Sequence, residues 1–132
     1  MIVKPSVMSK QIVVVEDDAD ILALMQYILA EQGYQVICYS RPETAKELTQ
    51  HRPSLILMDN RLTTMRSGNS FCAEIKADPS TNHIPVILVS ASGDLEQIAE
   101  KCQADGFLSK PFNLDDLVGL VNLHISNSTS FA

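Results

Sequence analysis

Acidic side chains follow two of the apolar runs in this sequence. The run VVV at 13–15 is followed at once by Glu16 and Asp17, and the run SLILM at 54–58 is followed by Asp59. Removing a carboxylate from water is costly unless a cation or hydrogen bonds compensate for the lost solvation. The acids are therefore either solvated loop residues or ligands that converge on a cation, and the surrounding elements decide between these interpretations.

A hydroxyl group and an ammonium group occupy matching positions farther along the chain. Ser90 ends the run 85–90, and Lys110 directly follows the run 106–109. A serine hydroxyl can donate to a phosphoryl oxygen, and a lysine ammonium binds such an oxygen as a compact point charge. With carboxylates nearby, these groups would suit the transfer of a phosphoryl group to a side-chain oxygen.

Five short apolar runs predict the strands that position these residues. The first, third and fourth runs are continuous in Val, Ile and Leu, a pattern typical of strands buried on both faces of a parallel sheet. The five runs cover residues 11–15, 34–39, 54–59, 85–90 and 106–109.

The segments between the runs have helical spacing. An apolar stripe over 21–29 predicts a first helix, with Gly33 where a C-terminal cap belongs. The stretch SRPE at 40–43 matches a capping box, and it predicts a second helix that reaches about Gln50.

Three more helices are predicted after the third run. Asn69 is expected to cap a helix that ends at 78–79, where Asp precedes Pro. A further apolar stripe covers 95–102, and Asn113 opens the last helix. The inward side chains predicted for that last helix are Leu114, Leu117, Val118, Val121 and Ile125.

The alternation of five strands with five helices predicts an α/β fold with a doubly wound parallel sheet. In such sheets, functional groups gather outside the carboxyl ends of the strands. If the strand order is 2-1-3-4-5, Asp59 lies centrally, with Asp17 and Glu16 on one side. Ser90 then lies on the other side. We therefore expect the carboxylates to converge on a hard cation, Mg²⁺ (or Mn²⁺), with Asp59 as the nucleophile.

Composition narrows the function classes. The 132 residues carry a net charge of -6 at pH 7 and no stripe rich in Lys or Arg, which argues against nucleic-acid binding. Three widely spaced cysteines, Cys38, Cys72 and Cys102, are typical of reduced thiols and not of a disulfide framework or a zinc site. The sequence has no signal-peptide core and no apolar run of membrane length, so we expect a cytoplasmic protein without a membrane partner.

Four motifs stand in order along the chain: VVVEDD, LILMDNRL, VILVSA and ADGFLSKPF. In this order and spacing they resemble the receiver domains of bacterial two-component response regulators, over roughly residues 10–125. The resemblance implies a flavodoxin-like (βα)5 fold and a protein that accepts a phosphoryl group on Asp59. The donor would be a histidine kinase or a histidine phosphotransfer protein, and the readout would be a downstream effector protein.

The resemblance also implies roles for individual residues. Asp59 would be the phosphoacceptor, Asp17 a direct Mg²⁺ ligand, and Glu16 the holder of a metal-bound water. The backbone carbonyl of Arg61 would complete the protein's metal ligands. The remaining implied residues are Ser90 as the switch hydroxyl, Phe107 as the switch aromatic, Lys110 as the family's lysine, and Pro111 after a cis peptide bond.

The segment after Asp59 departs from the family pattern. Asn60 stands where receivers usually have an apolar residue, and Arg61 places a long cation at a position whose side chain, in receivers, faces the phosphorylation site. The loop LTTMRSG (62–68) lacks the usual proline and is one residue longer. We hypothesise that Arg61, which can contact phosphate, alters the rate of dephosphorylation.

The expected organisation is one receiver domain over residues 10–125, a flexible tail over 126–132 and no output domain. Signalling would then rely on protein contacts made by a monomer or a weak dimer, and the only chemistry would be self-catalysed phosphorylation and dephosphorylation. Two alternatives are a degenerate receiver that binds partners without phosphorylation and a phosphatase with an aspartate nucleophile. The intact acid set argues against the first, and the lack of an evident cap insertion argues against the second.

Overall fold

The computed structural model describes residues 10–62 and 66–128, and in this part of the chain five strands alternate with five helices. The strands are β1 (Gln11–Val15), β2 (Gln35–Tyr39), β3 (Leu55–Asp59), β4 (Val86–Ser90) and β5 (Gly106–Ser109). The helices are α1 (Ala19–Glu31), α2 (Ala45–Thr49), α3 (Gly68–Ala77), α4 (Leu95–Lys101) and α5 (Leu114–Ser128). Every strand and helix predicted from the sequence is present.

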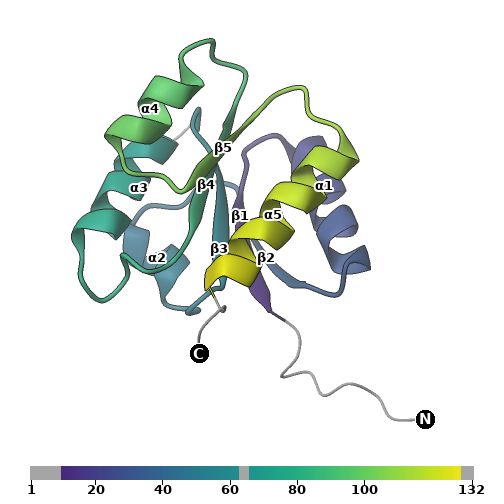
Figure 1. Cartoon of the computed structure of the whole chain (residues 1–132), viewed down its shortest axis with the longest axis horizontal. Coiled ribbons are helices and arrows are strands. Elements are labelled where there is room, and N and C mark those ends of the chain that lie inside the picture. The colour runs from purple at the N-terminus through teal and green to yellow at the C-terminus, as the bar shows by residue number, and fades with distance from the viewer. Residues whose placement is uncertain (1–9, 63–65, 129–132) are drawn as a thin grey trace.

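All five strands are parallel and lie in the order β2-β1-β3-β4-β5, which confirms the predicted topology (Figure 1). Val15 pairs with Met58, and Asp59 pairs with Val89. The carboxyl ends of β1, β3 and β4 therefore finish at the same edge of the sheet. This register places the residues that follow β1 beside the last residue of β3.

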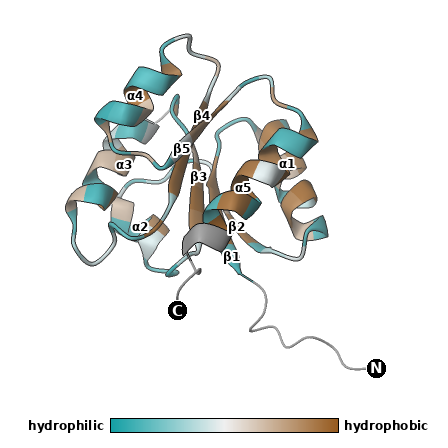
Figure 2. Ribbon diagram, in the orientation of Figure 1, coloured by the Kyte–Doolittle hydropathy of each residue, from teal (hydrophilic) through white to brown (hydrophobic). Residues whose placement is uncertain are grey.

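Helices cover both faces of the sheet. α1 and α5 lie on one side, and α2, α3 and α4 lie on the other (Figure 1). Along β1, Val13 and Val15 join the core under α2, α3 and α4, whereas Ile12 and Val14 join the core under α1 and α5. The strands are accordingly the most hydrophobic part of the ribbon (Figure 2).

The burial of the central strands explains why their sequences are continuous apolar runs. Every residue of β3 and β4 is buried, as is all of β1 except its first residue. Burying one Val, Leu or Ile side chain contributes roughly 1.5–3 kcal/mol. These strands therefore form a rigid base for the polar residues at their carboxyl ends, while β2 and β5 form the less buried edges of the sheet.

Helix α1 ends as the position of Gly33 predicts. Gly33 has a φ of 94°, a conformation that costs glycine little. Its N–H donates to the Ala30 carbonyl at 3.0 Å, and the N–H of Tyr34 donates to the Leu29 carbonyl at 3.2 Å. These two bonds form a Schellman cap, which ends the helix and directs the chain into β2.

The predicted cap of the second helix was wrong. The capping box of α2 consists of Thr44 and Glu47, and not of the residues at 40–43. The Glu47 carboxylate accepts two backbone N–H groups, at 2.7 and 2.8 Å. Starting the helix at this point buries Ala45 and Leu48 in the core, so packing selected the second of two consecutive capping motifs.

The start of α3 also differs from the prediction. Ser67 occupies the N-cap position, and Asn69 lies inside the first turn instead of capping it. The helix ends at Ala77, and Asp78 is the C-cap, as the Asp-Pro pair predicts.

Helix α5 is longer than predicted, and its first apolar residue faces water. Leu117, Val121 and Ile125 are buried as expected, but Leu114 is 52% exposed. Because helix side chains lean toward the N-terminus, Leu114 points past the end of the packed stripe. The helix continues through residue 128, into the segment predicted as a tail, and residues 129–132 lie outside the described residues.

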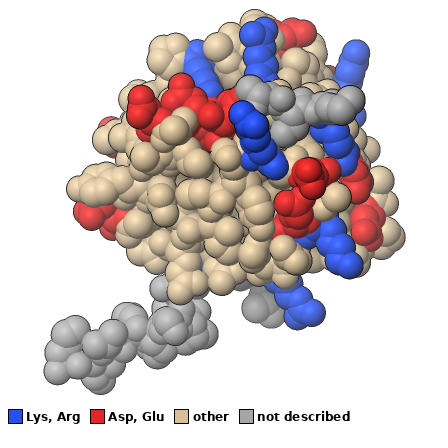
Figure 3. Space-filling view, turned by 180° about the vertical axis from the view of Figure 1, so that it is seen from behind, with Lys and Arg blue, Asp and Glu red and all other residues tan. Residues whose placement is uncertain are grey.

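Charges of both signs are mixed on the face shown in Figure 3, where Lys and Arg side chains are interspersed with Asp and Glu. A further group of acidic side chains gathers near the upper edge of that face. Among the helices that the structure describes, none combines the length and the apolar character needed to cross a membrane.

Candidate functional site

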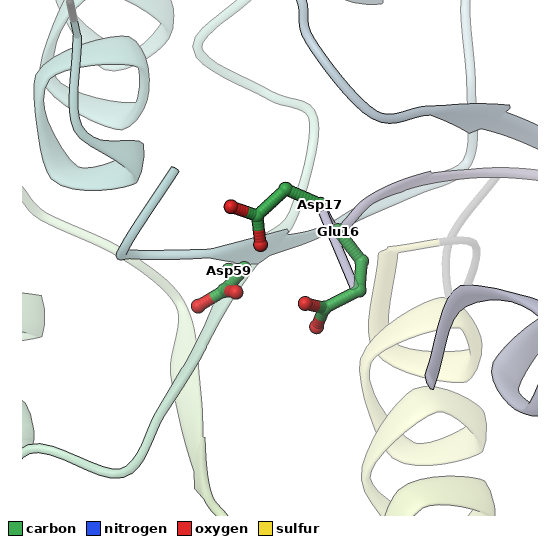
Figure 4. A group of neighbouring side chains, drawn as sticks. All are labelled: Glu16, Asp17 and Asp59. Atoms are coloured by element: carbon green, nitrogen blue, oxygen red, sulfur yellow. The ribbon is translucent and has the colours of Figure 1, made fainter. Parts of the chain in front are cut away.

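Three carboxylates meet at the carboxyl ends of β1 and β3 (Figure 4). Glu16 and Asp17 follow β1, and Asp59 is the last residue of β3. One oxygen from each side chain lies within 4.8 Å of the other two. The predicted convergence is confirmed, because neighbouring parallel strands of matched register end side by side.

The clustered acids differ in burial. Glu16 is 1% exposed and Asp59 is 5% exposed, whereas Asp17 is only partly buried. The next residue, Asp18, serves helix α1 instead, because its carboxylate accepts two backbone N–H groups of the first turn, each at 3.0 Å. The third acid of the stretch EDD is therefore a helix cap.

Lys110 brings a positive charge to the cluster from the β5 edge of the sheet. It follows β5, and its backbone N–H donates to the Ser90 carbonyl at 2.9 Å. Its ammonium lies 2.9 Å from Glu16 Oε1 and 3.2 Å from Asp59 Oδ2. Two buried carboxylates therefore share one positive charge. The peptide bond between Lys110 and Pro111 is cis, in agreement with the prediction.

The carboxylate of Asp59 is held at both of its oxygens. Oδ2 accepts from Lys110, and Oδ1 accepts the backbone N–H of Arg61 at 3.1 Å. The Arg61 peptide group thus lies beside this carboxylate, while the Arg61 side chain is exposed. The role of the Arg61 carbonyl as a metal ligand stays a prediction.

Ser90 and Phe107 lie on the neighbouring strands β4 and β5. Ser90 is 1% exposed, ends β4 beside β3, and accepts the N–H of Ser92 on its Oγ at 3.2 Å. Phe107 lies on the edge strand and is 39% exposed. Ser90 therefore borders the acid cluster, and Phe107 belongs to the surface of the sheet edge. Their roles as switch residues stay predictions.

Competition between burial and charge shifts two pKa values in the cluster. Burial raises the pKa of Glu16 to about 7; the Lys110 ammonium opposes this rise, and the Asp59 carboxylate adds to it. Burial acts to lower the pKa of Lys110, but the two carboxylate partners together outweigh burial, so this pKa is raised. Both pKa shifts arise because two buried carboxylates share one lysine.

The cluster fits a hard divalent cation. All of the candidate ligand atoms are oxygens, which Mg²⁺ and Mn²⁺ prefer. Two oxygens bound to one Mg²⁺ at about 2.0–2.1 Å lie at most roughly 4.2 Å apart, so these oxygens need to move by less than about 1 Å. Glu16 Oε1 is buried and forms an ion pair with the Lys110 ammonium at 2.9 Å, so the site already attracts a positive charge at this oxygen.

Sequence reasoning missed one contact near the site. Asn60 attracted notice only as a departure from a family pattern, yet it accepts the N–H groups of Gly68 and Asn69 at the start of α3. The residue type could have indicated this contact, because asparagine is a strong helix-capping residue. The sequence separation hid the contact, since helix caps are usually local.

Comparisons with known proteins agree with this fold. The family model for the response regulator receiver domain matches residues 12–122, a range that contains Glu16, Asp59 and Lys110. The phosphate regulon transcriptional regulatory protein PhoB of Escherichia coli is 32% identical over 117 residues, which are 86% of this chain and 51% of PhoB. The chain therefore spans about half the length of that relative.

Two further comparisons cover nearly the whole of the matched protein. The polar-differentiation response regulator DivK of Brucella anthropi is 32% identical over 126 residues, which are 92% of this chain and 100% of DivK. The solved signal receiver domain of a signal transduction histidine kinase from Syntrophus aciditrophicus superposes with a TM-score of 0.81 at 27% identity, covering 94% of this chain and 96% of that one. The chain therefore belongs to the response regulator receiver domain family of two-component systems.

Proposed function

We propose that this receiver domain accepts a phosphoryl group on Asp59 from a phosphohistidine of a histidine kinase or a histidine phosphotransfer protein. The observation that carries the proposal is the arrangement of the Asp59 carboxylate. Arg61 N–H and Lys110 orient it, and it lies among carboxylate oxygens that fit a divalent cation. An oriented carboxylate beside a cation site is what an aspartate nucleophile requires.

In the proposed step, an oxygen of the Asp59 carboxylate attacks phosphorus, and the phosphorus–nitrogen bond of the donor breaks. The donor imidazole leaves with the electron pair of that bond. Mg²⁺ (or Mn²⁺), held by Asp17, Asp59 and the Arg61 carbonyl, with Glu16 behind a bound water, would neutralise charge on the phosphoryl oxygens. Lys110 supplies a fixed positive charge within 3.2 Å of the nucleophile.

An apolar groove beside Lys110 supports a protein as the donor. The groove has a volume of about 340 Å³. Its lining consists of Ile21, Leu24, Ala91, Lys110, Pro111 and Phe112. Apolar side chains at the edge of a charged site suit a partner helix that carries its reactive histidine next to apolar residues.

We further infer that the signal leaves through protein contacts. The phosphoryl charge would attract the Ser90 hydroxyl, and repacking around Phe107 would change the surface that α4 and α5 present to a downstream effector protein. In this proposal the chain works in the cytoplasm as a monomer or weak dimer, binds neither nucleic acid nor membrane, and is not an enzyme. Its only chemistry is self-catalysed phosphorylation and dephosphorylation.

The test is covalent labelling by a small phosphodonor in the presence of Mg²⁺. We expect mass spectrometry to find one phosphoryl group per chain, and none in Asp59→Asn or after chelation. Asp20→Asn is the matched control, because it removes the same charge from an exposed position in the first turn of α1. Phosphate release over many turnovers would favour a phosphatase, and the absence of any label would favour a phosphorylation-independent adaptor.

A further inference from the structure

The residue after Asp59 connects the site to helix α3. The first four N–H groups of a helix have no partner within the helix. In α3, Asn60 satisfies two of them: its carbonyl accepts the N–H of Gly68 at 3.0 Å, and its side-chain oxygen accepts the N–H of Asn69 at 2.8 Å. Ser67, at the N-cap position, directs its hydroxyl to the Asn69 side chain. Asn60 thus does the capping that an N-cap side chain usually does.

Helix α3 also begins in direct contact with the backbone at the end of β3. A Cβ atom added to Gly68 would lie 2.4 Å from the Asp59 carbonyl oxygen and 2.9 Å from Asn60 Cα, so only glycine fits there. On its other side, Asn60 donates its N–H to the Val89 carbonyl of β4 at 2.9 Å. Asn60 is therefore fixed between β4 and α3.

The position of Asn60 determines where the next peptide group lies. That group is the N–H of Arg61, which donates to Asp59 Oδ1. Because Lys110 binds the other oxygen, Oδ2, these two donors together set the rotation of the carboxylate. Without the Asn60 side chain, the bond to Asn69 is lost and only backbone bonds hold Asn60, so the chain after it gains freedom and the Arg61 N–H is held less firmly against Oδ1.

We propose that Asn60 is a positioning residue for Asp59: by capping α3, its side chain holds the Arg61 N–H against the Asp59 carboxylate and keeps that carboxylate oriented. The consequence for phosphoryl transfer rests on the proposed function, whereas the orientation itself does not. The proposal also accounts for a polar residue at a position where receivers usually have an apolar one. A misplacement of about 1 Å in a reacting group can cost roughly a hundredfold in rate.

Three variants separate positioning from a general loss of helix stability. Asn60→Ala removes the side-chain oxygen that accepts the Asn69 N–H, and Asn60→Asp keeps an oxygen in the same place. Ala73→Gly is the matched control, because Ala73 is exposed in the middle of α3. A glycine at such a position weakens a helix by an amount similar to the loss of a cap.

The first readout is hydrogen exchange of the Arg61 amide measured by NMR, which needs no phosphorylation. Asn60→Ala should lower the protection of this amide by at least about fivefold, and Asn60→Asp should restore it. Ala73→Gly should leave the protection within about twofold of wild type. Unchanged protection in Asn60→Ala, or an equal loss in Ala73→Gly, overturns the proposal.

The second readout is the initial rate of labelling by a small phosphodonor with Mg²⁺. Asn60→Ala should be labelled at least about tenfold more slowly than wild type, and Asn60→Asp should recover most of the rate. If wild type and Asn60→Ala are labelled at the same rate, the positioning role alone is refuted. If wild type takes up no label, the proposed function fails, and the exchange measurement still decides whether Asn60 orients the carboxylate.

Discussion

Replacing Asp17 by asparagine should make the metal-free protein more stable, although Asp17 lies in the proposed site. Its carboxylate has an oxygen within 4.8 Å of oxygens from both Glu16 and Asp59. At this separation, one pair of unit charges repels by about 3.5 kcal/mol at an effective dielectric constant of 20 and by about 0.9 kcal/mol in bulk water. Asp17 is partly exposed, so solvent screening favours the lower value. Because Glu16, with a pKa of about 7, is only partly ionised near neutral pH, removing these repulsions should raise the free energy of unfolding by about 1 kcal/mol.

The same substitution should weaken the response to Mg²⁺. A ligand that binds only the folded state stabilises it by about 2.7 kcal/mol when its concentration is 100 times the dissociation constant. Wild type should therefore gain stability as Mg²⁺ is added, and Asp17→Asn should gain much less because it has lost a ligand. The difference in the free energy of unfolding between the two proteins should therefore become smaller, or change sign, when chelator is replaced by saturating Mg²⁺.

Urea titrations followed by circular dichroism, with and without Mg²⁺, measure both effects. Asp20→Asn removes an acid from the first turn of α1 outside the cluster, so it should lose a little helix-dipole stabilisation and keep the full Mg²⁺ response. The reasoning fails if Asp17→Asn is less stable than wild type in chelator. It also fails if the two proteins gain equally from Mg²⁺.

Three further perturbations depend on single side chains. Arg61→Ala should shorten the half-life of the phosphorylated form by at least about twofold, because a guanidinium on the phosphoryl oxygens would hinder attack by water; equal half-lives would rule this out. Phe71→Ala should lower the free energy of unfolding by about 3–5 kcal/mol in urea titrations, since the ring is fully buried, and a loss below about 1 kcal/mol would contradict that packing role. Burial, with Cys102 nearby, raises the pKa of Cys72 above its ordinary value of 9.0, so only the unfolded chain releases this proton as the pH rises past 9.0. Wild type should then lose up to about 1.4 kcal/mol of stability per pH unit more than Cys72→Ala, whereas parallel slopes would show that the thiol does not titrate differently in the two states.

The sheet was predictable because its sequence pattern is strong and does not depend on which apolar residue occupies each position. The runs that became β1, β3 and β4 are continuous in apolar residues, and burial on both faces requires that pattern. The cap of α2 was not predictable, because SRPE (40–43) and TAKE (44–47) are consecutive stretches that both match a capping box. Core packing of Ala45 and Leu48 decided between them, and local sequence does not carry that information.

The site, like the fold, has contacts that the sequence predicts and contacts that it does not. The meeting of Glu16, Asp17 and Asp59 followed from strand order and register alone. The ion pair between Lys110 and Glu16 was not predicted, because it joins residues that follow β1 and β5, with β3 and β4 between those strands. Such contacts depend on how far a long side chain reaches, which neither periodicity nor spacing encodes.

The acid cluster links the stability of the fold to its proposed use. Glu16 and Asp59 are buried with one shared lysine, and burial already makes ionisation of Glu16 unfavourable. A folded chain keeps such a cluster only if other regions compensate, and here the buried strands that end at the cluster do so. The burial of these strands offsets the unfavourable energy of the cluster, and the same strands hold its oxygens together. A cation that binds there therefore meets carboxylates whose mutual repulsion folding has already overcome. Substitutions in β1 or β3 that loosen this base should therefore weaken Mg²⁺ binding even when no carboxylate is changed.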